Sequence, residues 1–218
     1  MLCIFPQSTN NNKRMRFVRI NSYTDSRFSQ AVLYQHGNYL INDKPYEVEI
    51  ISQGAAIVRG ETPANYPELI QEFLFHAPHI HTFVDGQGNI IAEVPKPKLI
   101  ELNLDQIQPS QFFIDETKLA AVKTFIKNEG DIIIQVWPWN RRYVALDGHT
   151  RLYLAVQKQY TKVNAVESET DEYTLYFVTE AQRRDVFSPK DMQKLSHEAY
   201  QTKWHRFCDN YFKERESL

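Results

Sequence analysis

Apolar and polar residues alternate along much of the first hundred positions, and this alternation predicts β-strands. Tyr46, Val48 and Ile50 alternate with polar residues and therefore share one face of an expected strand. Two short apolar runs, 31–36 and 39–41, lie on either side of a Gly-Asn pair, which predicts a hairpin. The N-terminal region is therefore expected to be a small β-rich domain.

One helix and a second hairpin complete this region. Residues 67–75 place apolar side chains at helical spacing, with acidic residues in the first turn, so we expect an amphipathic helix. An Asp-Gly-Gln-Gly stretch at 85–88 predicts the turn of the hairpin. Pro-Lys-Pro-Lys at 95–98 is a stiff, extended linker, so we expect residues 1–97 to form one α+β domain.

Three histidines, His76, His79 and His81, crowd around Pro78. Their spacing allows a metal ion to bind, but no nearby acid or cysteine completes a set of ligands. We therefore favour structural roles for these histidines over a metal site.

The pattern changes at residue 98. Apolar runs and amphipathic stretches follow one another in the order strand, helix, strand, strand, helix, strand. The expected strands lie at 99–102, 132–136, 143–146 and 162–166, and the expected helices lie at 118–126 and 151–158. We expect an α/β domain over residues 98–168.

Residues 169–218 are expected to form a helical extension. Ser188 followed by Pro189 predicts the start of a helix, because proline is favoured at the first helical position. Aromatic residues recur at steps of three and four, typical of a stripe that faces a core: Trp204, Phe207, Tyr211 and Phe212. The expected fold class is α+β, with an α/β domain between a β-rich domain and a helical tail.

The charge of the chain is nearly balanced, since 25 Lys and Arg against 27 Asp and Glu give −2 over 218 residues. No chain-wide basic field attracts a phosphate backbone, and DNA binding therefore needs a local patch. Cys3 and Cys208 lie near opposite ends, without metal-ligand spacing. With no apolar run of ~18 residues and no signal peptide evident, we expect a soluble, cytoplasmic protein.

The candidate chemistry lies where an expected strand ends at Asp147 and turns directly into a helix. Free backbone N–H groups and the positive end of the helix dipole meet there and attract phosphate. Gly148 allows the backbone to approach an anion closely. Thr150 can supply a hydroxyl, and Arg151 can add a charge-assisted hydrogen bond to phosphate oxygens. Asp147 or His149 could face a metal ion or a transferring group. From the residues alone, a plain helix cap by Asp147 explains the pattern equally well.

Three features recur together in one known family: Ile-x-Pro-Ser at 107–110, Asp-Gly-His-Thr-Arg at 147–151 and Ala155 in the next helix. On these residues, the stretch 98–168 resembles the ParB/sulfiredoxin superfamily domain. The five-residue string is shared with a branch that includes ADP- or ATP-dependent free-serine kinases. There the turn binds nucleotide phosphate, and its His and Arg assist phosphoryl transfer. The resemblance favours a phosphate site over a plain cap.

The chain also differs from the families that it resembles at several motif positions. The serine kinases place a catalytic Glu just after the proline of the opening motif, where this chain has Gln111, which cannot accept a proton. Asp115 or Glu116 could replace it. Sulfiredoxins need a Cys where His149 stands, so sulfinic acid repair is excluded. Chromosome-segregation ParB proteins bind CTP and carry a helix-turn-helix for DNA, which is not evident after Val166.

The resemblance implies a protein that binds ADP, ATP or CTP with Mg²⁺ and acts as a kinase or nucleotide hydrolase on a small hydroxyl-bearing substrate. Asp147, His149 and Glu116 are the candidate catalytic residues, and Asp147 is also the candidate metal ligand. The candidate cofactor-binding residues are Gly148, His149, Thr150, Arg151, Ser110 and Gln111. The alternative is a non-enzymatic regulator or adaptor that binds DNA or protein, and a homodimer stays open in both cases.

Overall fold

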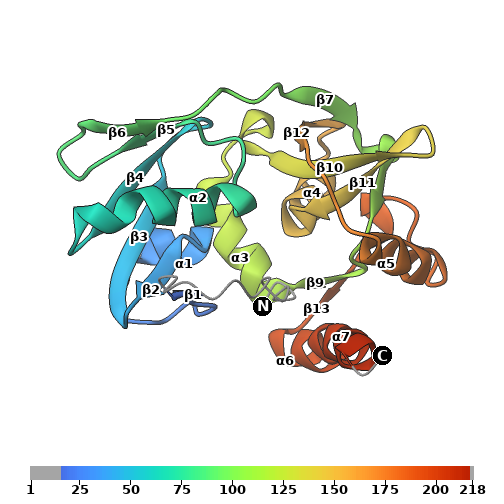
Figure 1. Cartoon of the computed structure of the whole chain (residues 1–218). Helices are drawn as coiled ribbons and strands as arrows, with labels where there is room; N and C mark the ends of the chain where they lie inside the picture. Colours follow the sequence, from blue (N-terminus) through green and yellow to red (C-terminus); the bar gives the residue numbers. More distant parts are fainter. Residues whose placement is uncertain (1–15, 217–218) are drawn as a thin grey trace.

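The computed structural model describes residues 16–216 and shows a mixed α/β protein, which confirms the coarse fold class expected from the sequence. Sheets of six, five and two strands are present in this part of the chain. Figure 1 shows that the six-stranded and five-stranded sheets occupy opposite sides of the molecule.

The N-terminal sheet has its strands in sequence order. They are β1 (Phe17–Arg19), β2 (Asn38–Ile41), β3 (Lys44–Ile50), β4 (Ala55–Gly60), β5 (Thr82–Val84) and β6 (Ile90–Glu93). Neighbours are antiparallel except β4 and β5, which run parallel because α2 (Tyr66–His76) crosses over between them. The amphipathic helix expected here is confirmed, since α2 buries Leu69, Ile70 and Phe73 in the core beside this sheet.

The expected strand at 31–36 is wrong, because this segment forms the helix α1 (Gln30–Gln35). Adjacent Val32 and Leu33 are both buried, which suits a helix against a core and not an alternating strand. His36, with φ of 57°, ends the helix, and the Gly37 N–H donates to the Val32 carbonyl at 3.0 Å. The hairpin therefore turns later, between β2 and β3.

The second sheet has the strand order β7, β12, β10, β11, β8. Its strands are β7 (Ile100–Asn103), β8 (Ile107–Pro109), β10 (Ile133–Trp139), β11 (Arg142–Asp147) and β12 (Lys162–Glu167). The four strands and two helices expected over 98–168 are all present, the helices being α3 (Glu116–Phe125) and α4 (His149–Gln157). The strands β8 and β9 (Phe113–Asp115) are additions that the sequence pattern did not indicate.

The C-terminal tail packs into the same core as residues 98–168. It contains α5 (Tyr173–Gln182), α6 (His197–Tyr200) and α7 (Arg206–Glu216), with a π-helical segment between the last two. Trp204 and Tyr211 are buried in one cluster with Ile114 and Leu152, which confirms the expected core-facing stripe. The helix expected to start at Ser188 is wrong, since a single 3₁₀ turn leads instead into β13 (Gln193–Leu195), which pairs with β9.

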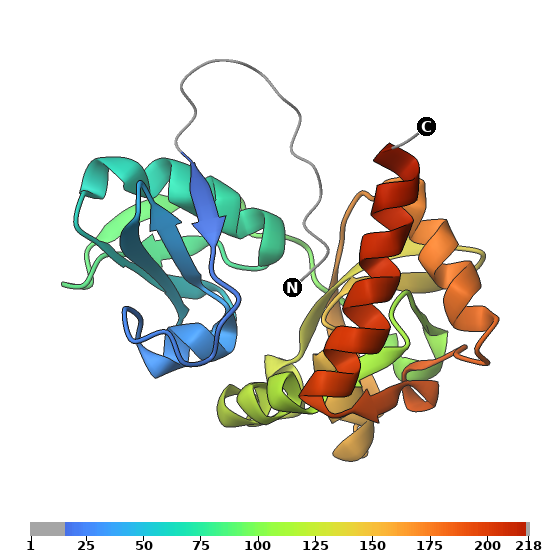
Figure 2. The same cartoon turned by 90° about the horizontal axis from the view of Figure 1, so that it is seen from below.

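The two halves of the molecule meet through α1, which lies against α3, and through two glutamines. Gln53 Nε2 donates to the Gly130 carbonyl at 2.8 Å. Gln135 Nε2, on β10, donates to the carbonyls of Phe75 and His76 at 3.2 and 3.1 Å, at the C-terminal end of α2. Figure 2 shows the same division from below, with α3 at the boundary. The end of α2 is thus held near the second sheet.

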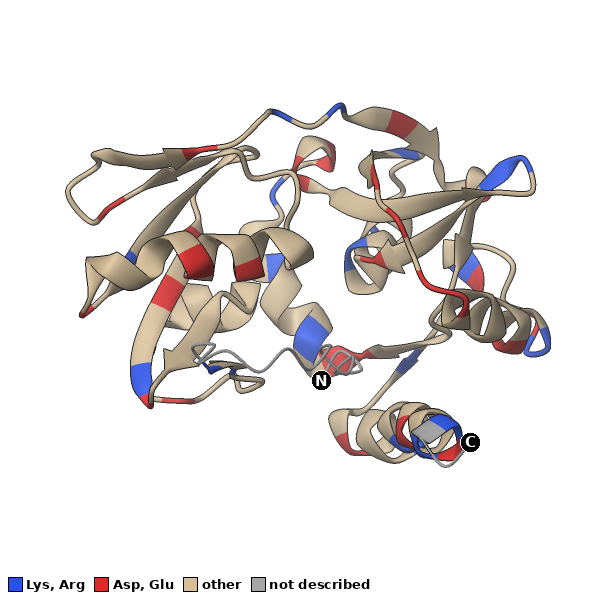
Figure 3. Cartoon of the chain, in the orientation of Figure 1, with Lys and Arg blue, Asp and Glu red and all other residues tan. Residues whose placement is uncertain are grey.

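Acidic and basic residues are interspersed along the described elements of both halves (Figure 3). None of the helices within residues 16–216 combines the length and apolar character that a bilayer crossing requires. Cys3 and the segment considered for a signal peptide lie outside the described residues.

Candidate functional site

The predicted turn lies at the junction of β11 and α4, where Gly148 is the N-cap of the helix. Gly148 has φ of 88° and ψ of 15°, a left-handed conformation that favours glycine. A Cβ at this position would lie 2.6 Å from Ile134 Cγ2, so the space is also closed to a side chain. Because glycine offers no capping oxygen, the first-turn N–H groups of α4 receive no side-chain cap from it.

Arg151 is anchored beside the turn. Its Nη1 donates to the Ile133 carbonyl on β10, and its Nη2 donates to Asp147 Oδ2 at 2.8 Å. The guanidinium therefore joins α4 to β10 and pairs with the carboxylate that precedes the turn. An arginine has five N–H donors, so these two bonds leave others for a ligand.

His149 is held by the loop that follows β8. The Ser110 N–H donates to His149 Nε2 at 3.2 Å, and Ser110 Oγ donates to the Ala145 carbonyl at 2.7 Å. Since Nε2 accepts, the proton of the neutral ring lies on Nδ1. Burial, reinforced by the charges of Lys118 and Arg151, lowers the pKa of His149 to about 4, so the ring is neutral at pH 7. Ser110 and His149 are thus brought together as expected.

Asp147 is ionised in cationic surroundings. Burial alone would raise its pKa, but the charges of Arg151 and Lys118 and a hydrogen bond from the Gly148 N–H hold the pKa well below its usual range. Among residues 16–216 no group of three or more His, Cys, Asp or Glu is arranged to hold a metal ion. One carboxylate already paired with Arg151 does not make a resident Mg²⁺ site, and Mg²⁺ would arrive here on nucleotide phosphates.

Thr150 and Gln111 differ from what the sequence suggested. Thr150 is only 4% exposed, so its hydroxyl offers little surface to a ligand. Gln111 Nε2 donates to the Phe113 carbonyl at 2.5 Å and to Tyr200 Oη at 3.3 Å, toward α6. These bonds direct the Gln111 side chain toward the tail and not toward the Gly148 turn.

Asp115 and Glu116, the two acids considered as a catalytic base, lie at the start of α3. Asp115 caps α3 by accepting from the Thr117 N–H at 2.8 Å, and its second oxygen pairs with His197 Nδ1 at 2.7 Å. Asp115 is therefore a structural residue in this protein. Glu116 is exposed in the first turn of α3. Neither acid is hydrogen-bonded to a residue of the Gly148 turn.

Several residues around the turn were not predicted. Lys118, on α3, has its pKa lowered by burial and by the positive charges of Arg19 and Arg151, while Asp147 opposes the shift. Burial also lowers the pKa of His76 and His79 to about 3, and Asp147 acts on both.

Lys118, His76 and His79 lie in segments that are separated from the turn in the sequence. No local sequence pattern could therefore predict that their charges interact with Asp147. Only the crowding of His76 and His79 was visible, and it was considered as a metal site. In the fold, the negative charge of Asp147 opposes the lowering of the pKa of both histidines.

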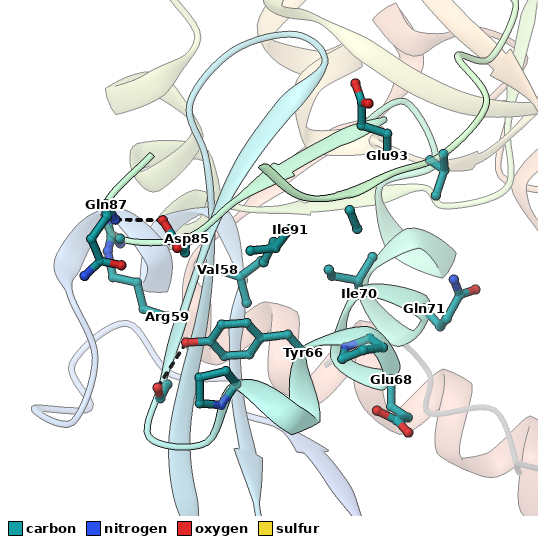
Figure 4. Close-up of a pocket in the computed structure, with 16 residues that line it drawn as sticks. Val58, Arg59, Tyr66, Glu68, Ile70, Gln71, Asp85, Gln87, Ile91 and Glu93 are labelled. Carbon is teal, nitrogen blue, oxygen red and sulfur yellow. Dashed lines mark hydrogen bonds between the residues drawn. The ribbon is translucent and has the colours of Figure 1, made fainter. Parts of the chain in front are cut away.

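A separate groove of about 790 Å³ lies between α2 and the hairpin of β5 and β6. Figure 4 shows apolar side chains that point into it, among them Val58, Ile70 and Ile91, with Tyr66 beside them. Polar residues, including Glu68, line its other sides. None of the residues predicted for the site lines this groove, so it is distinct from the Gly148 turn.

Comparison of the sequence with models of known protein families gives no match, and comparison with curated proteins gives none either. Among solved structures, protein Atu1540 from Agrobacterium tumefaciens is similar over 45% of this chain, with 13% sequence identity and a TM-score of 0.33. The match spans 62% of that chain, less than two thirds of its length. So distant a likeness carries no functional argument, and the chemistry of the site rests on its own geometry.

Proposed function

We propose that the Gly148 turn binds the phosphate groups of a nucleotide. The observation that carries this proposal is the strand-to-helix turn itself, where a left-handed glycine leaves the first N–H groups of α4 without a side-chain cap. Those N–H groups and the positive end of the helix dipole favour an anion. Gly148 also adopts the left-handed conformation that turns β11 directly into α4.

The charges around the turn support an anionic ligand. Lys118 experiences the positive charges of Arg19 and Arg151 and the negative charges of Asp147 and Asp115. Counting Lys118 itself, three cations face two carboxylates, and Asp115 is already paired with His197. A bound phosphate would relieve the repulsion among the cations, and Arg151 retains N–H donors for it.

The same turn supports assignment of residues 98–168 to a ParB/sulfiredoxin-like domain. In the resembled branch, the Asp-Gly-His-Thr-Arg string lies between a strand and a helix, and here it lies between β11 and α4. The resemblance supplies the nucleotide as the phosphate source, with ADP, ATP and CTP as the candidates, and Mg²⁺ as a companion of the nucleotide.

The surroundings favour nucleotide binding over phosphoryl transfer. A kinase that acts on a hydroxyl needs a base with a suitable pKa close to the acceptor. Gln111 cannot serve, and Asp115 caps a helix. Glu116 is exposed and is not hydrogen-bonded to the turn, and the lowered pKa of Asp147 makes that carboxylate a weak base. We therefore propose a nucleotide-binding regulator first, with a kinase or hydrolase that acts on a small hydroxyl-bearing substrate as the second candidate.

Calorimetric titration of ADP, ATP and CTP, each with Mg²⁺, tests the proposal. Arg151→Lys removes the planar fork of donors, and Arg142→Lys is the matched control, because Arg142 also donates to backbone carbonyls, those of Asp105, Ile107 and Phe187. We expect at least one nucleotide to bind the wild type and the control, and to bind Arg151→Lys about tenfold more weakly or worse. No binding of any nucleotide would overturn the proposal.

A further inference from the structure

Two cations without a carboxylate partner lie at the boundary between the halves. Arg19, at the end of β1, and Lys118, in the first turns of α3, are both partly buried. Neither belongs to any ion pair among the described residues. Removing a cation from water is unfavourable unless an anion compensates it, so this pair requires an explanation.

The fold holds the Arg19 side chain at this boundary. Arg19 Nε donates to the His36 carbonyl at 2.8 Å, at the C-terminal end of α1. His36 is fixed in turn, since its Nε2 lies 3.0 Å from the Tyr23 hydroxyl. Because α1 lies against α3, the anchored Arg19 is brought toward the helix that carries Lys118. The same helix α3 also packs against α4, which begins at the Gly148 turn.

The electrostatics agree with this placement. Burial lowers the pKa of Lys118, and the positive charges of Arg19 and Arg151 lower it further, while the negative charges of Asp147 and Asp115 oppose the shift. Burial also lowers the pKa of His36 and His76, and the charges of Lys118 and Arg19 lower both further. The two cations therefore lie among histidines whose burial favours the neutral form. An anion is the group that would stabilise them there.

We propose that Arg19 and Lys118 bind the terminal phosphate of a nucleoside di- or triphosphate whose inner phosphate lies at the Gly148 turn. This inference rests on the proposed function and adds a second anion subsite to it. The ligand then contacts both halves, and the N-terminal sheet has a direct role in recognising it through Arg19. A nucleoside monophosphate fills the turn alone and leaves the two cations without an anion.

Calorimetry with AMP and ADP, both in the presence of Mg²⁺, separates the two subsites. We expect the wild type to bind ADP about 10- to 100-fold more tightly than AMP, because ADP gains charge-assisted bonds to both cations. Arg19→Gln and Lys118→Met should each remove about tenfold or more of this advantage, so that ADP affinity falls by more than AMP affinity. Lys123→Met, an exposed position on the same helix, is the matched control and should keep the full advantage.

Arg19→Lys keeps the positive charge and should retain most of the preference for ADP, and thermal melting shows which variants are folded. Equal affinity of the wild type for AMP and ADP would overturn this inference and leave the Gly148 site intact. An ADP advantage that survives in folded Arg19→Gln and Lys118→Met would overturn it as well. If AMP, ADP, ATP and CTP all fail to bind the wild type, the proposed function fails, and the second subsite fails with it.

Discussion

At the scale of single residues, Gly148 is the position on which the site depends most. Its left-handed φ and the Ile134 side chain next to it both exclude a Cβ. Gly88 has nearly the same φ, 86°, but nothing within 4 Å of an added Cβ. Alanine substitution at Gly88 therefore measures backbone strain alone, whereas alanine substitution at Gly148 measures backbone strain together with steric overlap.

We expect Gly148→Ala to lower the free energy of unfolding by about 2–5 kcal/mol, because backbone strain and overpacking add together. Gly88→Ala should lose only about 1–2 kcal/mol, since backbone strain acts there alone. Urea denaturation of the two variants measures both losses. Equal losses would show that Ile134 moves aside and that the close packing of the turn is unimportant.

The position of the turn could be predicted from the sequence, but the bonding of its residues could not. A strand ending in Asp147 and Gly148 before a helix is a local pattern, and the structure has it. The pairing of Arg151 with the Ile133 carbonyl depends on how β10 lies beside β11 and α4, which no local pattern specifies. Arg19 and Lys118 lie on elements about a hundred residues apart, so their approach follows from the tertiary fold alone.

At the scale of elements, α3 shows why an acid near the site need not be catalytic. Asp115 is the N-cap of this helix and the partner of His197. Asparagine caps helices about as well as aspartate, and alanine does not. The cap can therefore be tested separately from any chemical role.

We expect Asp115→Ala to be less stable than Asp115→Asn by about 1 kcal/mol or more, because only the alanine variant loses the cap. Both variants should bind ADP as the wild type does. Denaturation and calorimetry on the same preparations provide the two measurements. A stable Asp115→Asn protein that no longer binds ADP would place Asp115 in the ligand site.

The elements that sequence patterns missed are short or paired over long distances. The strands β8, β9 and β13 have three residues each, too few to show an alternation. β13 pairs in parallel with β9 although about 80 residues separate them. The helix α1 was mistaken for a strand because six residues of mixed polarity fit either period.

At the scale of the whole molecule, buried neutral histidines make stability depend on pH. The pKa of His149 is lowered to about 4, that of His76 and His79 to about 3, and that of His36 well below its usual value, all by burial first. In the unfolded chain a histidine titrates near its ordinary pKa of about 6.5. Below that pH, the unfolded chain therefore binds protons that the folded protein does not.

We expect stability to fall as the pH drops from about 7 to about 4, by up to about 1.4 kcal/mol per pH unit for each such histidine. Asp147 acts in the same direction at lower pH, because its lowered pKa gives stability that is lost on protonation. His79→Gln should show a shallower decline than the wild type in urea titrations at pH 7, 6 and 5. A free energy of unfolding that does not change over this range would contradict the neutral, buried state of these rings.

The measurement that tests the central claim most directly is the effect of ADP with Mg²⁺ on the backbone amide resonances of the ¹⁵N-labelled protein. Because the phosphate is expected to accept bonds from the first N–H groups of α4, the largest shifts should belong to His149, Thr150 and Arg151. Shifts confined to the groove between α2 and β6, or no shifts with ADP, ATP or CTP at millimolar concentration, would contradict a nucleotide site at the Gly148 turn.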